Sequence, residues 1–128
     1  MPAPSSLPEY VYKIVLDDPT PFLPTGLPVS ELDKKDGFIH LSTAEQAPVT
    51  VRRFYGDATA IYLLQVVYAA VEDKIKWDET SSGTFPHIYD QDLSKSLNAK
   101  NVRKVLECRR DEDATWDGIV EKTIALAQ

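Results

Sequence analysis

Cysteine is almost absent from this chain, and its scarcity excludes two ways of holding a small fold together. The 128 residues include one cysteine, Cys108. A lone cysteine has no partner for an intrachain disulfide, and it cannot supply the cysteine pairs of a structural zinc site. We therefore expect no metal site, a reducing compartment such as the cytoplasm, and an inert buried thiol at Cys108.

Basic residues and long apolar runs are also scarce. Lys and Arg number 14 against 20 Asp and Glu, a net charge of −6, whereas proteins that bind duplex nucleic acid neutralise phosphates with an excess of Lys and Arg. The longest apolar run, 60–71, is interrupted by Gln65 and is far shorter than the roughly 20 residues of a membrane helix. The expected partner is therefore a small molecule, not duplex nucleic acid or a membrane. The sequence leaves the oligomeric state open.

Length and composition are those of a single globular domain. Hydrophobic residues make up 43% of the chain and charged residues 27%, within the usual globular range. The nine prolines gather in the first half of the sequence. We expect a disordered, Pro-rich leader over 1–9, a single domain over 10–128, and a long loop over 17–29, where four prolines prevent a helix.

The spacing of apolar residues predicts an α+β fold. Strands are predicted over 10–16, 38–41, 59–67, 74–77 and 85–89. Residues 102–109 suit a helix by spacing and a strand by β-branched content, and we choose a strand. Helices are predicted over 48–55, with Val51 and Phe54 facing inward, and from Asp117 onward. Ser30 is expected to cap a short turn, and 42–45 has the form of a capping box.

The chain has only two histidines, the side chains best suited to proton transfer near neutral pH. Strand alternation over 38–42 places Phe38, His40 and Ser42 on one side. The turn that follows has free backbone N–H groups that can hold an anion, so His40 and Ser42 fit the wall of a polar pocket. The alternative is structural: His40 bonds a carbonyl at a strand end and Ser42 is a cap.

The second histidine lies in the run Phe85-Pro-His-Ile-Tyr89. Pro86 fixes the backbone before His87, and Tyr89 lies two residues further on the same face. Both rings then point toward one ligand. The alternative is a strand-start proline with Tyr89 packed and His87 exposed.

Charge is uneven in the last third of the sequence. Residues 95–110 are basic, and the acidic residues of 111–121 are expected to neutralise them in the folded protein. Arg52 or Arg109, placed beside a pocket of His and Ser, is suited to holding a phosphate or a carboxylate.

Four segments carry a resemblance to a known family: Tyr12-Lys-Ile14, the run DGFIHLSTAEQ over 36–46, RFYG over 53–56, and FPHIY over 85–89. Over roughly 10–110, the chain resembles the small proteins called domain of unknown function 952. That family in turn resembles ADP-ribosyltransferases, most nearly the tRNA 2′-phosphotransferases, which share a His-Leu-Ser strand followed by a small-residue turn and a helix.

The resemblance implies a fold of two small, split antiparallel sheets with a few short helices and with NAD held in the cleft between them. His40 and Ser42 match the His-Leu-Ser element, and Thr43 and Gln46 line the turn after it. Where the transferases have a His-Gly-Thr strand for NAD, this sequence has Tyr12-Lys-Ile, and the arginines of the phosphotransferases have no clear counterpart.

The candidate site therefore has two catalytic residues and a set that binds the ligand or cofactor. The catalytic pair is His40 and His87; the binding set is Tyr12, Lys13, Ser42, Thr43, Gln46 and Tyr89. The expected ligand is small and anionic or nucleotide-like, and the resemblance implies ADP-ribosyl or phosphoryl transfer. Two alternatives stay open: a non-catalytic module that binds a ligand in the same cleft, and an enzyme that uses His acid–base chemistry on a metabolite without NAD. We further expect His40 and Ser42 to open into one cavity, with His87 across it.

Overall fold

The strands form two small antiparallel sheets. A computed structural model describes residue 4 and residues 6–128, so the expected leader over 1–9 lies partly outside the described residues. The first sheet has the order β1 (Tyr10–Val15), β3 (Ala60–Val67) and β6 (Val102–Arg109). The second has the order β2 (Ile39–His40), β5 (Gly83–Ile88) and β4 (Ile75–Thr80). The expected α+β class with two split antiparallel sheets is confirmed.

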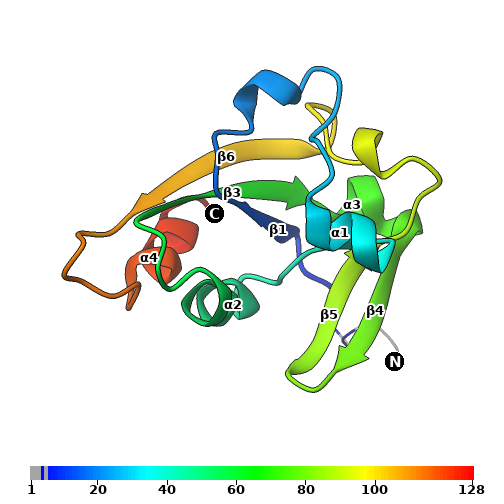
Figure 1. Cartoon of the computed structure of the whole chain (residues 1–128). Helices are drawn as coiled ribbons and strands as arrows, with labels where there is room; N and C mark the ends of the chain where they lie inside the picture. The colour runs from blue at the N-terminus through cyan, green and yellow to red at the C-terminus, as the bar shows by residue number, and fades with distance from the viewer. Residues whose placement is uncertain (1–3, 5) are drawn as a thin grey trace.

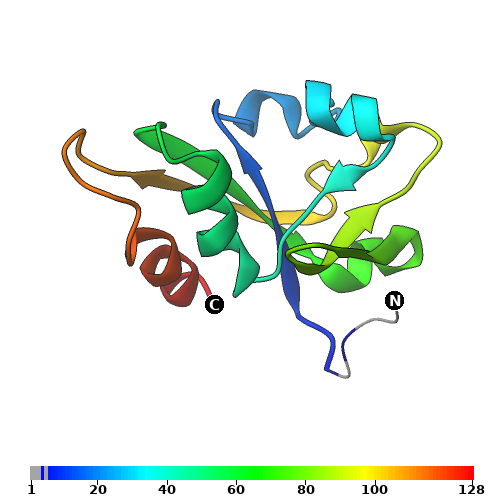
Figure 2. The same ribbon diagram turned by 60° about the horizontal axis from the view of Figure 1, so that its bottom comes forward.

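Short helices connect and cover the sheets. The α-helices are α1 (Glu31–Asp36), α2 (Gln46–Phe54), α3 (Tyr68–Val71) and α4 (Ile119–Leu126). Single 3₁₀ turns lie at η1 (Thr20–Phe22), η2 (Glu72–Lys74) and η3 (Leu93–Lys95). Helices α2 and α4 cover one face of the first sheet, while α1 lies beside the β4–β5 hairpin (Figures 1 and 2). Among the described residues, none of the helices has both the length and the apolar character needed to cross a membrane.

Alternation along β1 divides the core into two clusters. Tyr12 and Ile14 pack into a cluster with α2 and α4 that includes Trp116. Val11 points to the other face and packs into a cluster that includes Trp77 of the hairpin. Lys13 shares the face of Val11, so its side chain extends toward the second sheet and α1. This placement brings Lys13 to the candidate site.

One pair of residues joins the two sheets directly. The Tyr12 amide donates to the Ser42 carbonyl at 2.7 Å, and the Ser42 amide donates to the Tyr12 carbonyl at 2.9 Å. The segment that leaves β2 therefore pairs with the free edge of β1 before it enters α2. This backbone pair fixes where α2 begins relative to both sheets.

Several local expectations are corrected around α2. The helix begins at Gln46, before Pro48, because a proline in the first turn has no N–H that needs a helical partner. The capping box lies one residue later than predicted: the Gln46 amide donates to Thr43 Oγ1 at 3.2 Å, and the Thr43 amide donates to Gln46 Oε1 at 3.0 Å. Val51 is buried as expected, but Phe54 is exposed. The strand predicted over 38–41 is confined to two residues.

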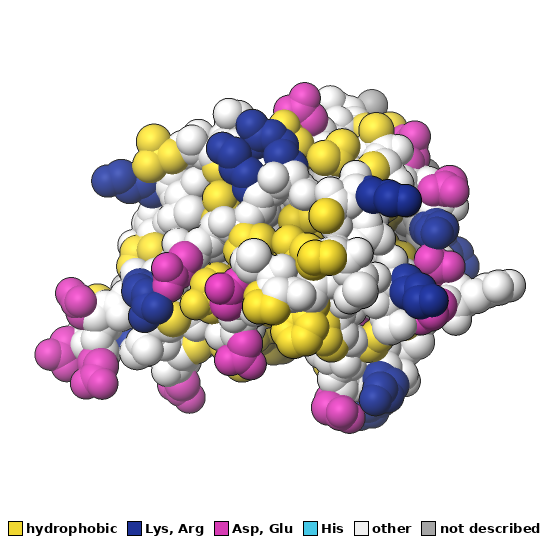
Figure 3. All heavy atoms as spheres, turned by 90° about the horizontal axis from the view of Figure 1, so that it is seen from above, with side chains coloured by type: hydrophobic (Ala, Val, Ile, Leu, Met, Phe, Trp, Pro, Cys, Tyr) yellow, Lys and Arg dark blue, Asp and Glu magenta, His cyan; other side chains and the backbone are white. Residues whose placement is uncertain are grey.

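The strand predicted over 102–109 is confirmed as β6, which lies at an outer position of the first sheet. Charged side chains lie along it: Arg103, Lys104, Glu107 and Arg109. Seen from above Figure 1, this side of the molecule carries basic and acidic groups around an apolar centre (Figure 3). Cys108 is buried and its thiol is free, and burial raises the pKa of the thiol. The burial predicted for this thiol is confirmed.

Candidate functional site

The two histidines lie side by side on neighbouring strands. In the antiparallel register of β2 and β5, His40 is directly opposite His87. Their ring centroids are 5.1 Å apart and the rings meet edge to face. The predicted proximity of the two imidazoles is confirmed, but no cleft separates them because directly paired strand residues touch.

His40 is held between two carboxylates of α1. Its Nδ1 lies 2.6 Å from Asp33 Oδ1, and its backbone amide donates to the same oxygen at 3.2 Å. Its Nε2 lies 2.9 Å from Asp36 Oδ2. Both ring nitrogens can donate to these carboxylates only when the ring carries two protons. The two carboxylates hold the ring at a fixed orientation.

Asp33 also anchors a buried ion pair. Lys13 Nζ donates to Asp33 Oδ2 at 2.6 Å, with Lys13 6% and Asp33 2% exposed. Burial lowers the pKa of Lys13, although the Asp33 carboxylate opposes that shift. Burial also acts to raise the pKa of Asp33, but the His40 and Lys13 contacts outweigh it, and the pKa lies below its ordinary value. Asp33 is therefore the ionised centre that links Lys13 to His40.

His87 has a carboxylate partner of its own. Its Nδ1 lies 2.7 Å from Asp78 Oδ2, and the Tyr89 hydroxyl donates to the same oxygen at 2.6 Å. The Tyr89 contact, with a smaller part from His87, lowers the pKa of Asp78, and burial together with Asp78 raises the pKa of Tyr89 to about 12. Burial lowers the pKa of His87, against the opposing effect of Asp78. His87 is thus a neutral imidazole near neutral pH, with its Nδ1 positioned by Asp78.

One nitrogen of His87 is free at the surface. Nε2 of His87 has no hydrogen-bond partner within the part of the chain that the structure describes. Among those residues, the Nε atom of Arg110 is the one buried side-chain polar atom without a partner, so the free Nε2 is not sealed from solvent. The rest of the ring is covered, and His87 is 5% exposed. A buried imidazole with one open nitrogen is suited to accept or deliver a proton.

Phe38 provides much of that cover. Its ring stacks on His87 with centroids 4.2 Å apart, and it lies 4.7 Å from His40 and 5.1 Å from Tyr89. Phe38 follows Gly37, whose positive φ of 82° ends α1 in the left-handed conformation that glycine adopts readily. That turn directs Phe38 onto the same face as both histidines.

The other predicted binding residues divide into two groups. Tyr89 and Lys13 belong to the histidine network. Ser42 is buried, and its hydroxyl lies 3.5 Å from that of Thr50. Thr43 and Gln46 form the capping box, and the Gln46 side-chain amide also donates to the Thr84 carbonyl of the hairpin at 2.7 Å. These three residues support the start of α2 and its contact with the hairpin.

Tyr12 lies away from the candidate site, in contrast to its predicted role in ligand binding. It is 0% exposed, and its hydroxyl accepts from Gln65 Nε2 at 3.2 Å within the core that α2 and α4 cover. Because neighbouring strand residues point to opposite faces, the face that brings Lys13 to the site takes Tyr12 away from it. Tyr12 contributes its backbone pair with Ser42, not a ligand contact.

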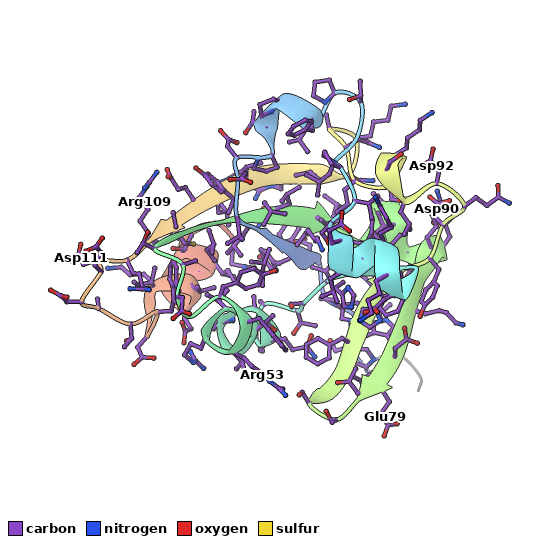
Figure 4. The ribbon with its side chains drawn as sticks, viewed as in Figure 1. Arg53, Glu79, Asp90, Asp92, Arg109 and Asp111 are labelled. Carbon is purple, nitrogen blue, oxygen red and sulfur yellow. The ribbon has the colours of Figure 1, made fainter. Side chains whose placement is uncertain are left out.

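The depressions in the surface and the two arginines suggested as anion ligands lie away from the histidines. Two shallow depressions of about 470 and 420 Å³ flank α2, and neither is lined by His40, Ser42 or His87. Arg52 pairs with Glu121, and Arg109, at the far end of β6 (Figure 4), pairs with Glu107. Within 4 and 6–128, no three His, Cys, Asp or Glu side chains are grouped to hold a metal ion.

Sequence reasoning misses the carboxylates and the aromatic cover. Ser30 caps α1 as expected, accepting from the Asp33 amide at 3.1 Å, but the Asp33 carboxylate belongs to the site. Asp36 lies four residues before His40, within reach of it across the Gly37 turn. Asp78 is paired with Phe85 across the β4–β5 hairpin, so recognition of the hairpin places it near His87. Phe38 lies two residues before His40 and therefore on the same side of the strand.

Comparison with family models identifies the chain. A model described as "Protein of unknown function (DUF952)" matches 25–105, which is more than half of the chain. The chain belongs to this family. The matched range contains α1, both histidines and the β4–β5 hairpin, so the family model covers the candidate site apart from Lys13.

Solved structures of one bacterial relative have the same fold as this DUF952 chain. The crystal structure of protein CC0527 from Caulobacter crescentus has a TM-score of 0.69 and 28% identity, and the match covers 83% of this chain and 91% of that one. The solution NMR structure of CC0527 gives a TM-score of 0.64 at 27% identity, with 85% and 92% covered. No protein with curated annotation matches the chain.

Proposed function

We propose that this DUF952 protein is a cytoplasmic enzyme that transfers protons to and from a small metabolite without NAD. The observation that carries the proposal is the pairing of two imidazoles, 5.1 Å apart, each with its Nδ1 on a carboxylate. A carboxylate on Nδ1 fixes the tautomer and the orientation of an imidazole, which is how acid–base histidines are prepared.

The two histidines have different roles. His87 is the acid–base group, because its Nε2 is free and burial lowers its pKa, so a neutral ring is available to accept a proton. His40 has both nitrogens on carboxylates and is a rigidly oriented ring beside the reacting atoms. Lys13 acts through Asp33 and is a positioning residue.

The ADP-ribosyl or phosphoryl transferase alternative has less support. A pyrophosphate needs free donors. Lys13 already donates to Asp33, and amides at the start of α2 are taken by the Thr43–Gln46 capping box. A transferase-like ancestry is compatible with the two split sheets, but fold alone does not establish activity. If no compound is turned over, the protein is better described as a non-catalytic module that binds a ligand.

Isotope incorporation tests the proposal even though the substrate is unidentified. The protein is incubated with a pool of small metabolites in D₂O, and mass spectrometry detects deuterium that any compound gains at carbon and retains after return to H₂O. We expect at least one compound to react, with His87→Gln reducing the rate on the order of 100-fold or more. NAD and ADP-ribose are included in the pool.

The outcomes separate the three functions. Turnover that needs His87 but not NAD supports the proposal. Products formed from NAD support the transferase alternative instead. No turnover of any compound, or full activity in His87→Gln, contradicts the acid–base role. Asp113→Asn, in the loop between β6 and α4, is the control for a change remote from the histidines.

A further inference from the structure

The polar atoms left free around the histidines are mostly acceptors. Asp36 Oδ2 and Asp78 Oδ2 are engaged, whereas the Oδ1 atoms of both carboxylates have no hydrogen-bond partner among the described residues. The two side chains are 34% and 33% exposed. A molecule at this surface therefore meets carboxylate oxygens that need donors, together with the free Nε2 of His87.

The cations near the site are already committed. Lys13 is buried against Asp33, and Lys76 lies with its Nζ 5.1 Å from the centre of the Tyr89 ring. Lys76 thus shows that a cation is attracted to this aromatic and acidic surface, as expected for an ammonium over a π face. Asp36 and Asp78 keep free carboxylate oxygens, whereas Lys13 and Lys76 are already engaged, which disfavours an anionic ligand.

Aromatic rings surround the open nitrogen. Phe38 stacks on His87 and lies close to His40 and Tyr89, and its own ring is only half-buried. The exposed part of this ring is a flat apolar surface next to the histidines. Another flat ring can stack there at low cost, since aromatic pairs favour offset or edge arrangements with centroids about 4.5–7 Å apart.

We propose that this site takes a small aromatic amine, a flat unsaturated ring that carries a positively charged, hydrogen-bond-donating group. The ring lies on Phe38, and the ammonium group donates to Asp36 and Asp78. The inference rests on the site of the proposed function and replaces the anionic ligand expected from the sequence with a cationic one. It places the ligand ring within reach of His87.

Three matched probes test the ligand class: benzylamine, its saturated counterpart cyclohexylmethylamine, and benzoate. Binding is followed by NMR through the ring signals of the two histidines, which report on the site itself. We expect benzylamine to give saturable shifts of His87 with a dissociation constant in the millimolar range. Cyclohexylmethylamine should bind about fivefold more weakly, and benzoate should give no saturable shift.

Variants of the site test separately its contact with the ring of the ligand and its contact with the ammonium group. Phe38→Leu should reduce the preference for benzylamine over cyclohexylmethylamine to less than about twofold. Asp36→Asn and Asp78→Asn should each weaken benzylamine about tenfold. Asp36→Asn is the safer variant, because Asp78 also holds Tyr89, and the histidine signals of each variant show whether the site is still folded. Asp113→Asn removes the same charge elsewhere and should leave the affinity unchanged.

The results distinguish this inference from the proposed function. Benzoate binding as tightly as benzylamine, equal binding of the saturated amine, or an unchanged affinity in Asp36→Asn would each overturn the aromatic amine. If that happens while isotope incorporation still depends on His87, the enzyme assignment stands and only the ligand class is wrong. Benzylamine bound as expected without any turnover leaves the ligand class standing and contradicts the enzyme.

Discussion

Lys13 and Asp33 are removed from water together, and their charges depend on each other. Their contact of 2.6 Å compensates the loss of hydration only while both charges are present. The same carboxylate holds His40. A change at either residue therefore affects both the stability of the fold and the orientation of the site.

Lys13→Met should lower the free energy of unfolding by about 3–5 kcal/mol, because Asp33 is then buried without its ammonium partner. Asp33→Asn should be costly for the same reason. The double variant Lys13→Met/Asp33→Asn should lose less than the sum of the two single losses. Urea denaturation measures all three.

The exposed Lys35 of α1 provides the control, since Lys35→Met should change stability by less than about 0.5 kcal/mol. Additive losses in the double variant would show that the two charges do not interact as described.

His87 makes stability depend on pH in a defined direction. Burial lowers its pKa below the ordinary 6.5, so the unfolded chain binds a proton more readily than the folded one. The contribution is therefore complete above pH 6.5 and is lost as the pH falls below it. The pKa values of Asp33 and Asp78 are lowered from 3.8, so their contributions are lost only in more acidic solution.

We expect the free energy of unfolding to decrease between about pH 7 and pH 5, and the decrease to be smaller in His87→Gln. Urea denaturation at a series of pH values measures the slope, and NMR titration of His87 should give a midpoint below 6.5. A midpoint above that value would contradict the effect of burial.

The residues of the site are partly predictable from the sequence. The shared face of Phe38 and His40 follows from backbone alternation, which needs no tertiary information. The contact of His40 with His87 depends on which strands pair, and the loss of Tyr12 to the core depends on which face of β1 meets α2. Asp33 and Asp78 reach the histidines only through tertiary packing, so sequence spacing does not assign them.

At the scale of elements, the start of α2 has two functions. The capping box between Thr43 and Gln46 satisfies amides of the first turn, and the Gln46 side-chain amide donates to the Thr84 carbonyl. Arg53, further along the helix, extends toward the hairpin (Figure 4) and donates to the Ser82 hydroxyl. The helix thereby holds the tip of the β4–β5 hairpin, which carries Asp78 and His87.

Gln46→Glu separates the two functions, because a carboxylate keeps the capping acceptor and loses the donor to Thr84. We expect faster hydrogen exchange over 80–86 with little change in the free energy of unfolding. Thr43→Ala should do the reverse, with a loss of about 1 kcal/mol and unchanged exchange in the hairpin. Hydrogen exchange with mass spectrometry and urea denaturation provide the two readouts. Equal effects of both variants on the hairpin would contradict a separate tether.

The sequence predicts elements better than it predicts their ends. Strands β1 and β3 are rich in β-branched and other apolar residues, and their positions follow from composition, whereas the sequence of β6 is ambiguous between strand and helix. The predicted start of α2 at Pro48 is two residues too late, because Pro48 lies within the first turn and is not its first residue. The sequence predicts the capping box at Ser42 because the pattern there resembles the one at Thr43 that forms the box. Helical spacing assigns Phe54 to the core, but α2 ends there beside solvent.

At the scale of the molecule, each core cluster contains one of the two tryptophans. Trp77 packs with the hairpin side, and Trp116 packs with α2 and α4. Strands β1 and β3 contribute to both clusters, and the Tyr12–Ser42 backbone pair joins the sheets. The clusters therefore share their central strands, and we expect them to unfold together.

Trp77→Phe and Trp116→Phe each leave one fluorescent reporter, in one cluster at a time. The fluorescence midpoint in urea should coincide with the circular dichroism midpoint in each variant. A reporter that changes well before the circular dichroism signal would show that its cluster unfolds as a separate unit.

Strand β6 has an open edge, since β3 pairs with it on one side only. Unpaired backbone amides and carbonyls on such an edge are a template for another strand and hence for aggregation. Arg103, Lys104, Glu107 and Arg109 along this edge make the approach of an extended apolar chain unfavourable. Arg109, which the sequence suggests as a ligand for phosphate, is thus one of the charged groups that disfavour strand addition at this edge.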